Sequence, residues 1–413
     1  MNRFTRYAII AVSVLIIGWV GFGKVLGRSA NDNTYKSLIV YSEVLQKIQQ
    51  DYVDEPDMHL VTAGSLHGLL ESLDSESSYL TPREYTEYKQ KSSSTAIGET
   101  GLNLSKRFGY IIVTSVLPDT SAEKAGLHSG DILESIAGFT TREMSVGQAK
   151  NLLAGQPGTG VKVGVIRRGK TDPEEVEVVR EKLSTPRLIA QRVDNETLAL
   201  RFPTLDPGRA DEVRTRLMDA QKQGVNRVIL DLRECGRGPV SEAIAIARLF
   251  VPSGQLVALR GQTVPAQIFS ADASKVVWKG PVSILMDGTT TGAAEVLAAS
   301  LANTKRGDLV GDRTFGLASE QKLIPLDDGA ALFLTVANYY NADGKSILEE
   351  GVTPTEVVRA SAAAADDSDD GEDVTITPGT PKDSTIGPRP LSSDDPVLRK
   401  ALELLKSPVK KAA

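Results

Sequence analysis

Apolar residues recur at helical spacing in the first quarter of the chain. From Tyr35 to Tyr52 they fall three, four and seven positions apart, and this spacing predicts an amphipathic helix. A second helix is predicted over about residues 60–73, and Thr81-Pro82 marks the start of a third, because proline favours the first helical position. We therefore expect an N-terminal helical region over residues 31–95.

Farther along the chain, short apolar runs alternate with helical patterns. The segment Asn226–Leu232 is almost continuously apolar, as is usual for a strand buried on both faces of a parallel sheet. Helical patterns lie on either side of it, at Pro207–Lys222 and Pro239–Phe250. A further strand follows at Val282–Asp287, and a further helix at Val296–Ala302. This alternation predicts an α/β domain, rich in βαβ units, over residues 184–358.

The longest uncharged apolar run, Tyr7–Gly23, follows the basic residues Arg3 and Arg6. It is short for a membrane span and long for a signal peptide, so it favours an uncleaved anchor within residues 1–30. The basic residues favour a cytoplasmic N-terminus. We expect a single pass through an inner membrane, with the body of the protein in the periplasm or outside the cell. The alternative is secretion after cleavage near Ala30.

The last part of the chain divides into two segments of different composition. Residues 359–394 are rich in alanine, aspartate, serine, proline and threonine, which predicts a disordered acidic linker. In residues 395–413, Asp395-Pro396 opens a short helix that runs through Leu405 with its apolar residues on one face. That face needs a surface to cover it, and we expect the helix to dock on the α/β domain.

Composition narrows the function further. Much of the net charge of −6 lies between Asp366 and Asp373, so the body of the protein is nearly neutral, which argues against a nucleic-acid partner. The single cysteine, Cys235, excludes an intramolecular disulfide framework and a cysteine-based zinc site. The histidines show no metal-ligand spacing, so the sequence predicts neither a metal nor a cofactor.

Residues 96–183 read as a separate module. It has three glycine-containing segments, Gly101-Leu-Asn-Leu104, Ala125-Gly-Leu127 and Gly130-Asp-Ile-Leu133. It also has a predicted strand at Tyr110–Val116 and a predicted helix near Ser145–Leu153. This series resembles a PDZ domain. The resemblance implies that a peptide C-terminus binds there as an added strand. The residues implied in binding are Gly101, Leu102, Asn103, Leu104, Ala149, Leu152 and Leu153. The alternative is that the neighbouring domain occupies the groove, or that it is empty.

Two turns in the α/β region carry the features of a reactive site. One follows a strand and runs from Gly288 through three threonines to Gly292 and Glu295, where a helix begins. The other runs from Gly311 to Leu317. A strand that breaks into a small-residue turn and feeds a helix presents backbone N–H groups at the edge of a sheet, as nucleophile elbows do.

These turns resemble the core of the C-terminal processing peptidases, which are serine–lysine proteases that carry a PDZ domain. The stretches that agree with the two turns are Val228-Ile-Leu-Asp-Leu-Arg233, Leu73-Asp-Ser-Glu-Ser-Ser-Tyr-Leu-Thr-Pro82 and Gly351-Val-Thr-Pro354. The resemblance covers about residues 35–358. It implies a crotonase/Clp-like sheet, with the PDZ domain inserted after the N-terminal helical region.

The family's catalytic residues are missing from the matching positions. The nucleophilic serine corresponds to Gly292, the general-base lysine to Leu317 and a supporting aspartate to Asn303, while Gln321 does match. Glycine supplies no nucleophile and leucine supplies no base. The resemblance also places oxyanion-hole N–H groups at Gly236 and Gly238, although the residues between and before them depart from the family pattern.

Three functions remain open at this point. The first is a non-catalytic pseudopeptidase, tethered to the membrane by its N-terminal helix, that binds peptide or protein C-termini. The second is an active serine-type endopeptidase that uses an unorthodox nucleophile among Thr289, Thr290 and Thr291. The nearest lysines, Lys279, Lys305, Lys322 and Lys345, are expected to face solvent or to point away. The third is a structural subunit of an envelope assembly, and the sequence leaves homo- and hetero-oligomers open.

Overall fold

The computed structural model describes residues 32–93, 97–107, 109–142, 144–167, 170–359, 391–392 and 394–406. The expected anchor at Tyr7–Gly23 and almost all of the linker expected over 359–394 lie outside these residues. No helix within the described ranges is long and apolar enough to cross a membrane. The chain divides into two compact units, of which one ends at Ser65 and the other begins at Leu66.

The first unit holds helix α2 (Asp32–Asp51) and the start of helix α3 (Met58–Glu71). Both predicted helices are confirmed. Asp57 caps α3, because its Oδ1 accepts hydrogen bonds from the backbone N–H groups of His59 (2.9 Å) and Leu60 (3.2 Å). Several apolar side chains of α2, such as Leu38, remain exposed in the described structure.

The second unit contains a six-stranded sheet in the order β17-β14-β13-β10-β9-β8. In chain order its strands are β8 (Ile189–Arg192), β9 (Thr197–Arg201), β10 (Arg227–Asp231), β13 (Val282–Met286), β14 (Asp308–Gly311) and β17 (Glu356–Val357). All neighbours are parallel except β8 and β9, which are antiparallel. The buried parallel strand expected over Asn226–Leu232 is confirmed as β10.

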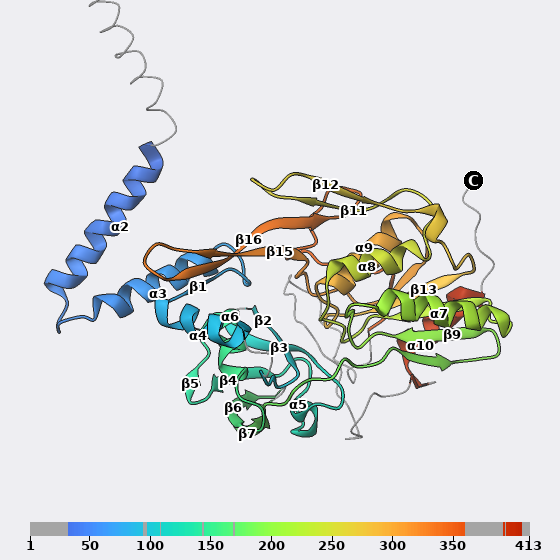
Figure 1. Ribbon diagram of the computed structural model, residues 1–413, viewed down its shortest axis with the longest axis horizontal. Coiled ribbons are helices and arrows are strands. Elements are labelled where there is room, and N and C mark those ends of the chain that lie inside the picture. The colour runs from blue at the N-terminus through green and yellow to red at the C-terminus, as the bar shows by residue number, and fades with distance from the viewer. Residues whose placement is uncertain are drawn as a thin grey trace, which may run out of the picture. The chain divides into compact units, whose positions relative to one another are not determined.

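Helices cover both faces of this sheet (Figure 1). Alternate residues of β10 point in opposite directions, so Val228 and Leu230 pack in one core and Ile229 in another. The first core includes side chains of α7 (Arg209–Lys222), α8 (Val240–Arg248) and α9 (Ala293–Asn303). The helices expected in these three regions are confirmed, and α9 begins three residues earlier than Val296.

The other face of the sheet is covered by the C-terminal helix α10 (Pro396–Lys406). Its buried residues, which pack against the strands, are Val397, Leu398, Ala401 and Leu405. Asp395 caps the helix, with Oδ1 accepting from the N–H groups of Val397 (2.9 Å) and Leu398 (3.3 Å). The expected helix and its docking on the α/β domain are confirmed.

A second, antiparallel sheet was not expected as such. It consists of β1 (Ser78–Leu80), β11 (Gln255–Arg260), β12 (Gln267–Ser270), β15 (Ser319–Pro325) and β16 (Ala331–Tyr340), with the 3₁₀ turn η1 (Ala273–Lys275) after β12. Residues of β11 and β16 join the core beside α8 and α9. This sheet therefore connects the turn after β14 to the segment that precedes α4 (Pro82–Ser93).

The third sheet forms the module expected over residues 96–183. Its order is β2-β3-β4-β6-β7, and β5 pairs with β4. The elements are β2 (Leu102–Arg107), β3 (Tyr110–Val116), α5 (Ser121–Lys124), β4 (Ile132–Ile136), β5 (Phe139–Thr140), α6 (Val146–Leu153), β6 (Gly160–Ile166) and β7 (Glu174–Val179). A capping box between Ser145 and Gln148 starts α6. Strand β2 lies at the edge of the sheet and beside α6.

Candidate active site

The turn that begins α9 has the backbone of a nucleophile elbow. Gly292 is the N-cap of α9, with φ 58° and ψ −118°. A residue with a side chain is strained in this conformation, whereas glycine adopts it freely. A Cβ built on Gly292 would have no heavy atom within 4 Å, so the position faces open space. The backbone geometry is therefore present without any reactive side chain.

Glu295 joins the two turns of the site. Its Oε2 accepts hydrogen bonds from the backbone N–H groups of Gly292 (2.8 Å) and Leu317 (2.7 Å). Its Oε1 accepts from the hydroxyl of Thr314 and the N–H of Gly316, both at 2.6 Å. The structure thus brings the backbone N–H groups of Gly292 and Leu317, the two positions that the resemblance assigned to a dyad, to the same carboxylate oxygen.

The carboxyl group of Glu295 has no contact with solvent. Burial raises its pKa above the ordinary value for glutamate, although the four donors favour the ionised form and act in the opposite direction. A buried acceptor of this kind is tolerated only because its hydrogen bonds replace water. Glu295 is therefore a positioning residue for both turns.

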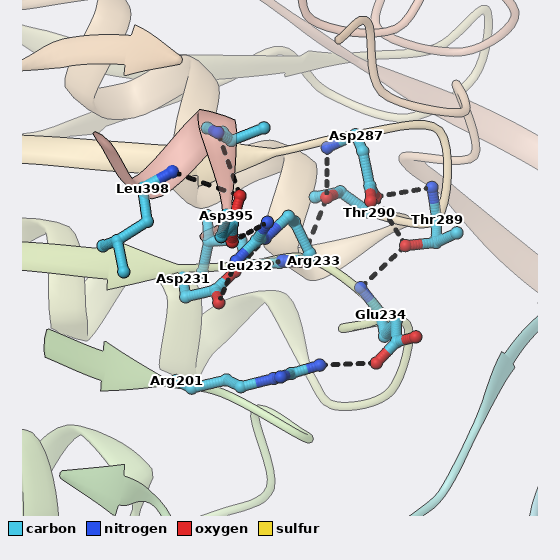
Figure 2. A network of polar contacts seen from close by, with 11 residues as sticks. Arg201, Asp231, Leu232, Arg233, Glu234, Asp287, Thr289, Thr290, Asp395 and Leu398 are labelled. Atoms are coloured by element: carbon cyan, nitrogen blue, oxygen red, sulfur yellow. Dashed lines mark hydrogen bonds and ion pairs between the residues drawn. The ribbon is translucent and has the colours of Figure 1, made fainter. Parts of the chain in front are cut away.

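The three threonines of the turn are tied to the loop that follows β10, and Figure 2 shows the contacts of Thr289 and Thr290. The hydroxyl of Thr290 donates to the carbonyl oxygen of Leu232 (3.0 Å), and the hydroxyl of Thr289 accepts from the N–H of Glu234 (2.7 Å) while it donates to Asp287. Thr291 is buried, and its backbone N–H donates to the carbonyl of Cys235 (3.0 Å). These hydroxyl and amide groups fix the loop against the turn.

Within the described residues the Asp287 carboxylate accepts from the Thr289 hydroxyl, but no lysine accompanies these threonines. The lysines that could have supplied a base, Lys279, Lys305, Lys322 and Lys345, are all exposed. This exposure agrees with the expectation that they face solvent. Among the residues that the structure describes, no lysine is hydrogen-bonded to a threonine of this turn.

Arg233 connects the same loop to the C-terminal helix (Figure 2). Its guanidinium group makes a two-pronged contact with the fully buried Asp231, at 2.8 and 2.9 Å, and a third contact with Asp395 at 2.7 Å. Burial alone would raise the pKa of Asp231, but the charge and hydrogen bonds of Arg233 outweigh burial and hold the pKa below its ordinary value.

The contact between Asp231 and Arg233 should make the stability of the protein depend on pH in the acid range. A carboxylate with a lowered folded pKa gives stability above its unfolded pKa of about 3.9, and this stability is lost as the pH falls through the folded pKa. Replacing Asp231 with asparagine should lower the free energy of unfolding by about 2 kcal/mol near neutral pH. The difference from the parent should shrink below about pH 4. Urea titrations at several pH values, followed by the fluorescence of the buried Trp278, measure it.

The matched control for this prediction is Asp219→Asn. The Asp219 side chain is half exposed and pairs with Lys222, so its removal should change the unfolding free energy little at any pH. A difference between Asp231→Asn and the parent that stays constant from pH 7 to pH 3 would contradict the role given to Asp231.

The two oxyanion-hole candidates lie in different surroundings. A Cβ on Gly236 would come within 2.5 Å of the Thr291 hydroxyl, so Gly236 packs directly on the threonine turn. Gly238 has φ 128° and packs instead on the backbone of Leu205. Burial raises the pKa of the Cys235 thiol to about 12, so this thiol is unreactive and packs in the core, as expected.

Asn303 does not join the site. It is the last residue of α9, whereas Gly292 precedes the first. Its side-chain amide donates to the carbonyl oxygen of Leu256 at 2.6 Å, and so ties α9 to β11. The helical rise of about 1.5 Å per residue already separates residues at opposite ends of such a helix by more than 10 Å.

Two contacts of the third sheet with this site were not expected. The guanidinium of Arg107, on β2, lies 4.4 Å from the centre of the Phe315 ring and donates to the Phe315 carbonyl at 3.1 Å. Arg237 of the loop after β10 pairs with Glu99 at 3.0 Å. No local pattern in the sequence signals either contact, because the partners are far apart along the chain.

The predicted peptide-binding residues lie at the β2 edge or behind it. Leu104, Ala149 and Leu153 are buried in the core of the third sheet, whereas Leu102, Asn103 and Leu152 are partly buried. Gly101 has φ 86°, and a Cβ there would lie 2.5 Å from Thr120. Glycine is thus required by the backbone at this position, and a bulky replacement would disturb the fold rather than only the binding of a ligand.

Comparison with known proteins agrees with this architecture. Residues 196–358 match the model of peptidase family S41, and residues 112–167 match that of the PDZ domain. A carboxy-terminal-processing protease of Bartonella bacilliformis is 28% identical over 331 residues, which cover 79% of this chain and 76% of the relative. The carboxy-terminal processing protease CtpA of Bacillus subtilis is 26% identical over 349 residues, 84% of this chain and 74% of the relative.

The fold has also been seen in a solved structure. The photosystem II D1 C-terminal processing protease superposes with a TM-score of 0.65 at 23% identity, over 78% of this chain and 92% of that one. The protein therefore has the α/β fold of the S41 peptidases together with a PDZ domain. More specifically, the two domain matches and the carboxy-terminal processing protease relatives support the C-terminal processing peptidases as the family of this chain.

Proposed function

We propose that this chain is a non-catalytic member of its family, a pseudopeptidase that binds peptide or protein C-termini through its PDZ domain. One observation carries the proposal. The backbone amides of Gly292 and Leu317 donate to the same oxygen of Glu295, so the two positions of the dyad meet, and neither has a side chain that could attack or accept a proton. A polarised carbonyl at this site would meet no nucleophile.

The threonines do not replace the missing serine in this proposal. The hydroxyl of Thr290 is fully buried and donates to a backbone carbonyl, and that of Thr289 lies between Asp287 and the N–H of Glu234. A hydroxyl becomes a nucleophile only when a base within hydrogen-bond reach removes its proton. The exposed lysines offer no such base. The Asp287 carboxylate does accept from the Thr289 hydroxyl, but Thr289 lies three residues before Gly292, the family's nucleophile position, and this displacement supports the inactive alternative over the endopeptidase.

Binding of C-termini rests on the PDZ domain. Strand β2 pairs with β3 on one side and is the last strand of its sheet on the other, so it offers backbone groups to an added strand. The apolar run Tyr7–Gly23 supports a membrane tether that leaves the PDZ domain in the periplasm or outside the cell. Cleavage near Ala30 would release the same binding module in soluble form.

The experiment compares cleavage and binding in the full-length protein, purified in detergent micelles. Incubation with a permanently unfolded protein should give no new fragments on a gel over many hours. Fluorescent peptides with a free C-terminus should bind, and their C-terminally amidated counterparts should bind at least about tenfold more weakly, because the loop donors recognise a carboxylate. Sustained hydrolysis that disappears in Thr291→Ala would overturn the proposal.

A further inference from the structure

The outer edge of β2 and the neighbouring helix α6 together form a surface, here called the β2–α6 edge. A segment of the same chain contacts this surface. This segment is the turn that precedes β1, and Asp74 shapes it, because its Oδ1 accepts from the N–H groups of Glu76 (2.9 Å) and Ser77 (2.6 Å). The turn holds the Glu76 side chain in one place before it reaches the PDZ domain.

The Glu76 carboxylate contacts both sides of the β2–α6 edge. Its Oε1 accepts from the hydroxyl of Ser105, on β2, at 3.1 Å. Its Oε2 lies 3.8 Å from the ammonium nitrogen of Lys150, on α6. The Glu76 side chain is only 13% exposed, whereas that of Lys150 is 54% exposed. The carboxylate thus lies between β2 and α6, where the side chains of a peptide added beside β2 would pass.

Two further contacts keep the turn in this position. The side-chain amide of Gln321 donates to the backbone carbonyl of Glu76 at 2.8 Å. On α6, Gly147 is approached so closely that a Cβ there would lie 2.9 Å from the Ser78 hydroxyl oxygen. Gln321 matches the family pattern, yet it contacts neither Gly292 nor Leu317 in these hydrogen bonds. Its role here is to hold the turn against the PDZ domain.

The β2–α6 edge carries a second basic residue, Lys106, which pairs with Glu71 at the end of α3. The ammonium group of Lys106 is buried and lies 2.9 Å from the Glu71 carboxylate. Lys106 and Lys150 therefore both face carboxylates supplied from outside the PDZ domain. An arriving peptide that displaces the turn would leave Lys150 without its partner unless the peptide brings a carboxylate of its own.

We propose that Glu76 is an internal competitor for the PDZ domain, and that the domain selects C-termini with an acidic side chain that replaces it. The inference rests on the proposed binding function and adds the class of ligand. Paired strands advance together residue by residue. With the terminal carboxylate near Gly101 and Leu102, Ser105 is reached about three residues before the end of the peptide, so the acidic residue belongs there.

The test uses the full-length protein in detergent micelles and three fluorescent peptides of about ten residues. All end in valine with a free carboxylate, and they carry glutamate, glutamine or lysine three residues before the last. The parent should bind the glutamate peptide about tenfold more tightly than the lysine peptide. Glu76→Ala should tighten binding of the glutamate peptide about threefold to tenfold, since it removes the competitor. Lys150→Glu should invert the preference.

The matched control is Lys162→Glu, on β6, where an exposed lysine pairs with Glu175. This variant should keep the preference of the parent. Equal affinities of the parent and Glu76→Ala for the glutamate peptide would overturn the inference and leave the proposed function standing. Equal affinities of the parent for the glutamate and lysine peptides would likewise overturn the inference and leave the proposed function standing.

Hydrogen exchange without any peptide separates the two proposals. Backbone amides of Leu102–Arg107 should exchange at least about threefold faster in Glu76→Ala than in the parent, because the covering turn is released. If no peptide binds to any variant, the proposed function fails, and unchanged exchange in Glu76→Ala then overturns the internal competitor as well. Faster exchange in that case would support the competitor alone.

Discussion

Replacing Gly292 with serine and Leu317 with lysine together should turn the protein into an active peptidase. The serine would enter a backbone conformation that already exists, at a strain of about 1–2 kcal/mol, and its side chain would point into open space. Glu295 holds both positions at one oxygen, so the two new side chains would start close together. Cleavage of an unfolded protein, followed by gel and mass spectrometry, measures the gain.

The single variants and a shape-matched pair serve as controls. Gly292→Ser alone should remain inactive, because a serine without a base is a weak nucleophile, and a positioned base contributes about 10²–10⁴-fold. Gly292→Ser with Leu317→Met has a long side chain without an amine and should also remain inactive. A folded double variant with lysine that cleaves nothing would show that the cleft has lost more than the two side chains.

Replacing Glu295 with alanine should destabilise the α/β domain by about 3–5 kcal/mol. The change would leave four donors around the carboxylate without an acceptor in a buried place, and unsatisfied buried groups are costly. Because α9 and the turn after β14 are both held by this carboxylate, they should loosen together. The midpoint of urea unfolding, monitored by Trp278 fluorescence, reports the change, since Trp278 is buried in the same domain.

The controls separate the hydrogen bonds from the loss of a charge. Glu295→Gln keeps one acceptor oxygen and should lose less stability than Glu295→Ala, although its amide group would face two donors. Glu350→Ala removes a glutamate from an exposed site in the same domain and should change stability by less than about 0.5 kcal/mol. A loss below about 1 kcal/mol in Glu295→Ala would contradict the role given to this carboxylate.

The parallel sheet was predictable because its strands are buried on both faces. The apolar residues of Asn226–Leu232 and Val282–Asp287 lie next to one another rather than at alternate positions, as is usual for strands buried on both faces. The turn at Gly292 was predictable because glycine can adopt the unusual backbone that joins a strand to a helix in a nucleophile elbow. In these regions the local pattern and the tertiary environment agree.

The second sheet could not be predicted in the same way. Strand β15 begins Ser-Glu-Gln-Lys, and its residues are exposed or half-buried, so its sequence has no continuous apolar run. Its pairing with β16 supplies the missing order, and that pairing is a tertiary property. The contact of Glu76 with Ser105 and Lys150 was hidden for the same reason, because a carboxylate in a polar turn does not indicate which surface it will meet.

The covering of the parallel sheet by α10 has a consequence for biosynthesis. Ile229 and Leu285 lie in strands that leave the ribosome long before Leu398 and Leu405, which shield them in the finished protein. Translation proceeds from the N-terminus, so one side of the nascent sheet stays bare until the helix has been made. During that interval we expect the unfinished domain to need chaperones that bind exposed hydrophobic surfaces and prevent aggregation.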